Sequence, residues 1–173
     1  MTSKDAISGW FAGRLPDEWY AGQPTVTVDN EEILVVGPLA APDMEGDASE
    51  EASAAACAAR AKRFREDTRE HRMAIADEAE AKFRRKVAWG AQVGEQRFLF
   101  TTYSVPVMTR LRQPERQVLD TLIAAGVARS RSEALGWCVR LVGENEQEWI
   151  SELRAAFEHV EQARSKGPSS RRS

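Results

Sequence analysis

The chain has 173 residues, of which 42% are hydrophobic and 29% charged, and its formal net charge is −3. These values are ordinary for a soluble chain of one domain or two small ones. No apolar run is long enough to span a membrane, and the opening MTSKDAISGW lacks the hydrophobic region of a signal peptide. We therefore expect a cytoplasmic protein that makes no membrane contact.

Charge is distributed unevenly along the chain. Residues 1–51 hold eleven acidic residues against two basic ones, residues 52–103 hold seven against eleven, and residues 104–173 hold nine against eleven. The mildly basic later parts permit contact with nucleic acid without demanding it. The two cysteines, Cys57 and Cys138, lack the spacing of a metal site and are expected to be free thiols.

An aromatic-rich flap is predicted at residues 8–24. Gly and Pro punctuate this stretch, so we expect a loop with a short helical turn at about residues 16–20. Its four aromatic side chains either cover the core of the following sheet or form an exposed patch that binds a protein partner.

The whole of residues 1–103 is predicted to form an α+β domain with the order ββ-α-ββ. After the flap we expect, in turn, a hairpin at 25–36, an acidic linker at 38–50, a long helix at 50–86 and a second hairpin at 87–103. The long helix carries the densest basic stretch of the chain. That stretch is either a solvated surface or a second contact with a nucleic-acid backbone.

Residues 104–165 are predicted to form a separate module of one strand and two helices, followed by a further helix. Residues 107–112 alternate between two faces, as a strand does. Pro114 suits the first turn of a helix that Gly126 ends. Ser130 and Glu133 have the capping-box spacing that begins a second helix.

The run AAGVARSRSEAL, which follows LDTL and precedes an apolar helix, resembles the ribbon-helix-helix family of bacterial repressors and antitoxin DNA-binding domains. The resemblance implies an intertwined homodimer. In that fold one strand from each chain pairs into an antiparallel ribbon, which enters the major groove of double-stranded DNA.

The resemblance also implies roles for individual residues. Three outward-facing strand residues would contact DNA bases: Met108, Arg110 and Arg112. Three residues at the start of the second helix would contact a DNA phosphate: Ser130, Arg131 and Ser132. The dimer core would be formed by apolar residues of the strand and both helices: Val107, Leu111, Val118, Leu119, Leu122, Leu135, Cys138 and Leu141.

A further amphipathic helix is predicted after Gly143, which we expect to break the previous helix. Apolar residues recur along it at helical spacing: Ile150, Leu153, Phe157 and Val160. This helix should pack against the two-helix core or join a dimer interface. Residues 166–173 are expected to form a disordered tail.

No motif for catalysis is found. The chain has no nucleotide-binding glycine pattern, no HExxH, no Cys/His zinc spacing and no nucleophile elbow. We therefore expect no enzymatic activity, no metal and no cofactor. The sequence indicates a dimeric DNA-binding protein of the transcriptional-regulator type. The alternative is a non-enzymatic, dimeric protein–protein interaction module that uses the same helices only to dimerise.

Overall fold

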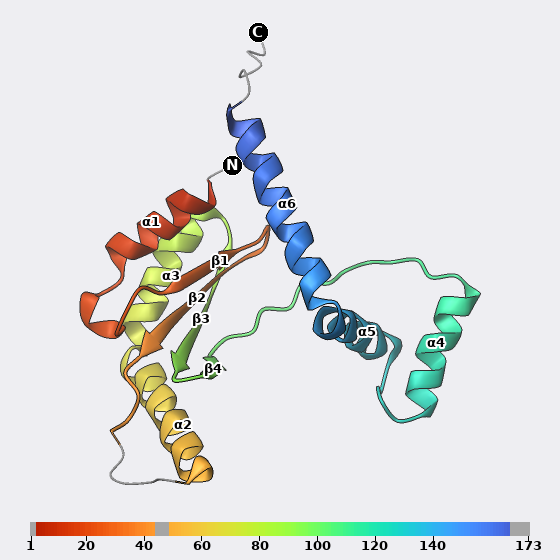
Figure 1. The fold of residues 1–173 in the computed structure, drawn as a ribbon, viewed down its shortest axis with the longest axis horizontal. Coiled ribbons are helices and arrows are strands. Elements are labelled where there is room, and N and C mark those ends of the chain that lie inside the picture. Colours follow the sequence, from red (N-terminus) through yellow and green to blue (C-terminus); the bar gives the residue numbers. More distant parts are fainter. Residues whose placement is uncertain (1–2, 44–48, 167–173) are drawn as a thin grey trace. The chain divides into compact units, whose positions relative to one another are not determined.

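The computed structural model describes residues 3–43 and 49–166 of a chain that forms two compact units, Met1–Val107 and Met108–Ser173 (Figure 1). The sequence analysis placed the boundary between residues 103 and 104. No helix in the described ranges is both long and apolar enough to cross a membrane.

A four-stranded sheet in the order β1-β2-β3-β4 forms the centre of the first unit. β1 (Thr25–Val28) and β2 (Glu32–Leu39) form an antiparallel hairpin. β2 runs parallel to β3 (Lys86–Val93), and β4 (Gln96–Leu99) returns antiparallel to β3. The predicted α+β class and the two predicted hairpins are therefore confirmed.

The strand ends differ from the predicted ones. β2 continues through Leu39 into the stretch predicted as linker 38–50, of which residues 44–48 lie outside the described ranges. The last strand ends earlier than the predicted residue 103. There the Trp89 N–H donates to Thr101 Oγ1 at 3.0 Å instead of to a backbone carbonyl, and the backbone ladder stops.

The predicted loop at residues 8–24 was wrong for its first half, because Lys4–Arg14 forms helix α1, followed by a 3-10 turn at Asp17–Trp19. The Ser3 hydroxyl caps α1 by accepting a backbone N–H of the first turn at 3.2 Å. Phe11 is fully buried and Trp19 nearly so. The aromatic residues of this stretch thus cover the sheet core, and their burial outweighs the low helix propensity of the neighbouring glycines.

The single long helix predicted at 50–86 is two helices, α2 (Glu50–Asp67) and α3 (Arg69–Phe83), which meet at Thr68. The Thr68 hydroxyl donates to the Phe64 carbonyl at 2.6 Å. Such a side-chain bond to the carbonyl four residues back competes with regular helix geometry. Because no Gly or Pro marks this break, the helix composition did not reveal it.

All three helices contribute to one hydrophobic core on one face of the sheet (Figure 1). The core includes alternate residues of the two central strands and one side of each helix: Ile33, Val35, Trp89, Ala91, Val93, Ile7, Phe11, Ala61, Phe64, Ile75, Ala79 and Phe83. An ion pair ties α1 to α3 at its edge, where the Arg14 guanidinium donates to both Glu78 carboxylate oxygens at 2.8 and 2.6 Å.

The second unit contains α4 (Gln113–Ala124), α5 (Arg131–Asn145) and α6 (Gln147–Lys166). Gly143 was predicted to break a helix, but it lies inside α5. Residues 167–173 of the predicted tail lie outside the described ranges.

The strand predicted at residues 107–112 is not formed, and among the described residues no strand pairs with this segment. A strand needs a hydrogen-bonded neighbour. In a ribbon-helix-helix arrangement that neighbour belongs to a second chain, which a single chain cannot supply.

A buried arginine holds the junction of α2 and α3. Arg72 is 6% exposed, and its Nε donates to Thr68 Oγ1 at 2.9 Å while its Nη2 donates to the Arg65 carbonyl at 2.6 Å. Its guanidinium lies 5.1 Å from the centre of the Phe100 ring. The cation thus occupies the carboxyl end of α2, where the helix dipole favours positive charge. Burial nevertheless lowers the pKa of Arg72.

We expect Thr68→Val to lower the free energy of unfolding by about 1–3 kcal/mol, because it leaves a buried guanidinium N–H without its acceptor while keeping the shape of the side chain. Urea denaturation followed by circular dichroism measures this change. Thr121→Val is the matched control. The Thr121 hydroxyl also donates to the carbonyl four residues back, Gln117, but it is exposed and accepts from no guanidinium. Equal losses in the two variants would show that Arg72 draws no support from Thr68.

Candidate nucleic-acid interface

Hydrogen bonds fix the connection between α4 and α5. Gly126 has a positive φ of 75°, which glycine adopts at low cost, and its N–H donates to the Ile123 carbonyl at 3.0 Å. The Ser130 hydroxyl accepts the Glu133 N–H at 3.2 Å. The Glu133 carboxylate in turn accepts the Arg129 N–H at 2.8 Å. The helix end predicted at Gly126 and the capped start predicted at Ser130 are therefore confirmed.

The three predicted phosphate contacts, Ser130, Arg131 and Ser132, lie together on the exposed start of α5. Arg131 is already engaged, because its Nε and Nη2 each donate at 2.8 Å to the carboxylate of Asp120 on α4. This pair raises the pKa of Arg131 and lowers that of Asp120. With the Ser130 hydroxyl acting as the cap, the groups left for a phosphate are Ser132 and the backbone N–H groups of the first turn.

Asp120 was missed by the sequence analysis. It lies eleven residues before Arg131, on a different helix. No periodicity within one helix connects the two positions, so the pair becomes visible only when α4 and α5 fold back on each other. Its effect is to hold the start of α5 against α4.

The three predicted base contacts lie in an extended segment, residues 101–112, that has no regular secondary structure. Met108 is fully exposed, and Arg110 and Arg112 are exposed as well. The junction of this segment with α4 is fixed at two points. The Glu115 carboxylate accepts the Arg112 N–H, and the Arg116 guanidinium donates to the Leu111 carbonyl at 2.7 Å.

The predicted dimer core is only partly covered within one chain. Leu119 is buried together with Ala128 and Ala134. Four other predicted core residues pack around this cluster and remain partly buried: Leu111, Leu122, Leu135 and Cys138. The remaining three are exposed: Val107, Val118 and Leu141. The single chain therefore leaves much of the apolar surface of this module open to water.

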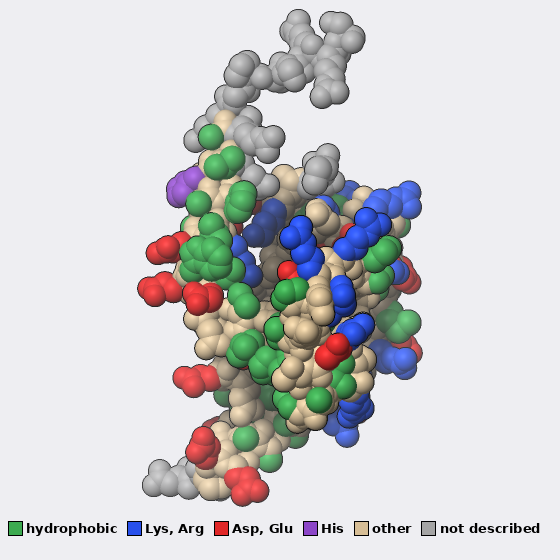
Figure 2. All heavy atoms as spheres, turned by 90° about the vertical axis from the view of Figure 1, so that its right-hand side faces the viewer, with side chains coloured by type: hydrophobic (Ala, Val, Ile, Leu, Met, Phe, Trp, Pro, Cys, Tyr) green, Lys and Arg blue, Asp and Glu red, His purple; other side chains and the backbone are tan. Residues whose placement is uncertain are grey.

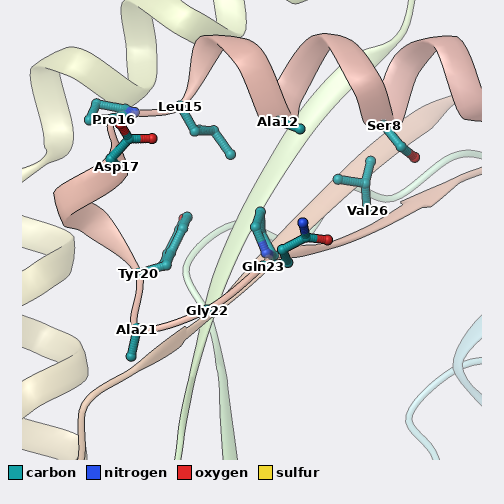
Figure 3. Close-up of a pocket in the computed structure, with 11 residues that line it drawn as sticks. Ser8, Ala12, Leu15, Pro16, Asp17, Tyr20, Ala21, Gly22, Gln23 and Val26 are labelled. Atoms are coloured by element: carbon teal, nitrogen blue, oxygen red, sulfur yellow. The ribbon is translucent and has the colours of Figure 1, made fainter.

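The first unit contains a pocket of about 460 Å³ between α1 and the approach to β1. Figure 3 shows Ser8 and Ala12 on α1 above Val26 and Gln23. The pocket is also lined by Asp17 and by the Tyr20 ring. These residues offer one carboxylate, that of Asp17, and several hydrogen-bonding groups.

No group of three or more side chains able to hold a metal ion occurs in the described ranges. The two free cysteines, Cys57 and Cys138, are half-buried in different units.

Two protein-family models match the chain. One is described as Rv1265-like protein, N-terminal domain, and matches residues 5–99; the other is described as Mb1296 C-terminal domain and matches residues 112–164. Neither is a ribbon-helix-helix model, so that resemblance stays a prediction.

Two mycobacterial relatives are similar over most of this chain. They are the uncharacterized protein Mb1296 of Mycobacterium bovis and the uncharacterized protein Rv1265 of Mycobacterium tuberculosis. Each is 58% identical over 159 residues, which cover 92% of this chain and 69% of the relative. No solved structure matches the chain.

Tyr20 provides a test of the packing behind the pocket. Burial raises the pKa of its phenol to about 12, although the nearby charge of Arg72 acts in the opposite direction. The unfolded phenol ionises near its ordinary pKa of about 10. Because the pKa is higher in the folded state, the buried neutral phenol contributes to the free energy of unfolding. This contribution is complete below about pH 10 and is lost as the pH rises towards about 12. Tyr20→Phe should remove the late component of the tyrosinate absorbance titration and flatten the alkaline loss of stability. If Tyr20→Phe instead removed a component that titrates near pH 10, Tyr20 would not be buried.

Proposed function

The chain belongs to the family of the Rv1265-like protein, N-terminal domain, and from the surface of its second unit we propose that it is a dimeric DNA-binding protein of the transcriptional-regulator type. Its partner molecules are then a second copy of the chain and double-stranded DNA. The proposal assigns it no enzymatic activity and no cofactor, and it places the protein in the cytoplasm, where the DNA is.

The observation that carries this proposal is the amount of apolar side chain that the α4–α5 module leaves exposed. Only three residues form its buried cluster, Leu119, Ala128 and Ala134. Large apolar side chains on the segment before α4, on both helices and on the connection between them are exposed: Val107, Met108, Val118, Val127, Val139, Leu141 and Val142. Figure 2 shows hydrophobic side chains on the surface beside Lys and Arg. Surface of this kind marks an interface, and a second copy provides a matching one.

In such a dimer the extended segment before α4 supplies the residues that contact the DNA bases. Residues 107–112 of the two chains would pair as an antiparallel ribbon, with Val107 and Leu111 turned to the shared core. The alternate residues Met108, Arg110 and Arg112 would then face outward. A two-stranded ribbon fits the major groove, and a guanidinium can donate two hydrogen bonds to guanine.

The start of α5 would face the DNA backbone. The first-turn N–H groups and the helix dipole favour an anion there. Because Arg131 is bound to Asp120, we assign it the role of holding α5 in place, and we assign direct phosphate contact to Ser132 and the backbone.

The engagement of Arg131 by Asp120 also supports a second candidate, a dimeric protein–protein interaction module that does not bind DNA. It removes one of the cations that DNA binding would use. In this alternative the exposed apolar surface serves dimerisation alone, and the aromatic-rich first unit or its pocket would contact a protein partner.

The preference of the protein for one DNA fragment over another tests whether Arg110 and Arg112 contact the bases. Replacing Arg110 and Arg112 together by Ala should reduce the preference for a selected fragment over an unrelated one at least about tenfold, because each lost base contact removes about 1–3 kcal/mol of discrimination. The assay is DNA affinity at two salt concentrations, with genomic fragments that include the protein's own promoter. Binding by the unaltered chain should weaken steeply with salt as counterions are released.

The matched control removes the same charge elsewhere, with Arg63→Ala and Arg69→Ala on the exposed surface of the first unit. This double variant should keep the preference. An unchanged preference in the Arg110 and Arg112 variant would show that other residues read the bases. No binding of the unaltered chain at low salt would favour the interaction module.

The dimer itself is tested by Leu122→Asp. Leu122 packs against the small buried cluster of the module, and a carboxylate there cannot be buried without a large desolvation cost. We expect loss of the dimer and of the helical signal of this module by analytical ultracentrifugation and circular dichroism. Gln117→Asp places the same charge on an exposed position of α4 and should leave both unchanged. A folded dimer from Leu122→Asp would contradict the shared core.

A further inference from the structure

The last helix carries an apolar stripe with a seven-residue period. Ile150, Leu153, Phe157 and Val160 in α6 follow one another at spacings of three, four and three residues. This spacing averages about 3.5 residues per turn, the repeat with which one helix packs along another. Sequence periodicity therefore predicts a helical partner for α6.

Most of this stripe is open to water. Phe157 is 68% exposed, Trp149 54%, Val160 52% and Leu153 38%, and Ile150 is half-buried. Apart from Trp149, the other described side chains of α6 are polar or small, with acidic ones at Glu148, Glu152 and Glu158. An amphipathic helix of this kind needs a second apolar surface.

We propose that α6 pairs in parallel with α6 of a second copy, with Ile150, Leu153, Phe157 and Val160 forming the seam. In a parallel, in-register pair each seam residue meets its own counterpart, so the stripe is complementary to itself. The surface that packs against the stripe is thus the same stripe on a second copy of the chain.

The residues beside the seam favour the parallel direction. Trp149 directly precedes Ile150, and Arg154 directly follows Leu153. In a parallel pair the residue before one seam position lies near the partner residue five positions further on. Trp149 therefore meets the partner's Arg154, and a guanidinium over an indole ring is attractive. An antiparallel pair centred on the same stripe instead brings the two copies of Arg154 together.

The tether to the rest of the chain matters to this pairing. The stripe spans only about two heptads, and isolated helices this short are marginal in water. A contact elsewhere between the same two chains would raise the effective concentration of one α6 for the other by orders of magnitude. The pairing does not require DNA binding, so it can hold where the DNA proposal fails.

Disulfide trapping in the full chain tests the pairing. In a background where Cys57 and Cys138 are replaced by Ala, which keeps both positions apolar, Leu153→Cys should form an intermolecular disulfide under mild oxidation, because each Leu153 meets its counterpart in the seam. Ser151→Cys, on the opposite face of the same helix, should cross-link at least about tenfold more slowly. Equal rates for the two variants, or no cross-link for either, would overturn the proposal.

A third cysteine variant tests the direction. Ala156 lies beside the seam, and in an antiparallel pair it would face its own counterpart. Cross-linking of Ala156→Cys but not of Leu153→Cys would therefore overturn the parallel arrangement. Because trapping uses no DNA, a chain that cross-links through Leu153 but binds no DNA would refute the DNA proposal alone.

Association constants provide the second measurement. Leu153→Asp should raise the dissociation constant of the full-length oligomer at least about tenfold in sedimentation equilibrium, since two carboxylates would enter the seam. Ser151→Asp adds the same charge outside the seam and should leave the constant unchanged. Equal constants for the two variants would contradict a role of α6 in association.

Discussion

The architecture of the first unit depends on a buried cation at a helix break. Arg72 bridges the carboxyl end of α2 and the side chain of Thr68, and its guanidinium lies over Phe100 just beyond β4. A buried charge without a carboxylate partner is costly unless helix carbonyls and hydroxyls take its place. Here they do so only if the helix ends at Thr68. The same arginine thereby sets the direction of α3 and connects both helices to the last strand.

The two units differ in how fully one chain can bury them. In the first, three helices cover one face of the sheet, and large side chains such as Phe11, Ile33 and Ile75 are completely buried. In the second, the α4–α5 cluster has three buried residues, two of them alanines. A core of this size stabilises little on its own, since stabilisation scales with the apolar area removed from water. The first unit is thus built to fold from one chain, whereas under the proposed function the second gains stability by association.

Sequence patterns predicted the elements whose signals are local. The hairpin turn at Asp29 and the cap at Ser130 each depend on a side chain that bonds to a backbone N–H a few residues away, and the helix end at Gly126 depends on the positive φ of one glycine. The errors arose where distant contacts decide the structure. α1 forms despite its glycines because Phe11 is buried in the shared core, where its ring contacts that of Trp89 in β3. The break at Thr68 exists because Arg72 is enclosed by other elements. At the candidate interface the exposed arginines and the capped helix were predicted, whereas Asp120 was not, because its partner lies on another helix.

Under the proposed function, the missing strand at residues 107–112 connects dimer assembly with DNA recognition. The backbone of this segment finds no strand among the described residues of its own chain, so a ribbon can form only together with a dimer. Under the proposed function the base-reading surface is therefore absent from the monomer. The free energy of DNA binding then includes the free energy of association, and dilution below the dimer dissociation constant should remove selectivity along with affinity. Each contact that strengthens the dimer would also strengthen selective DNA binding, even a contact that lies far from the DNA. A seam along α6 would act in this way, because it raises the dimer population without touching a base.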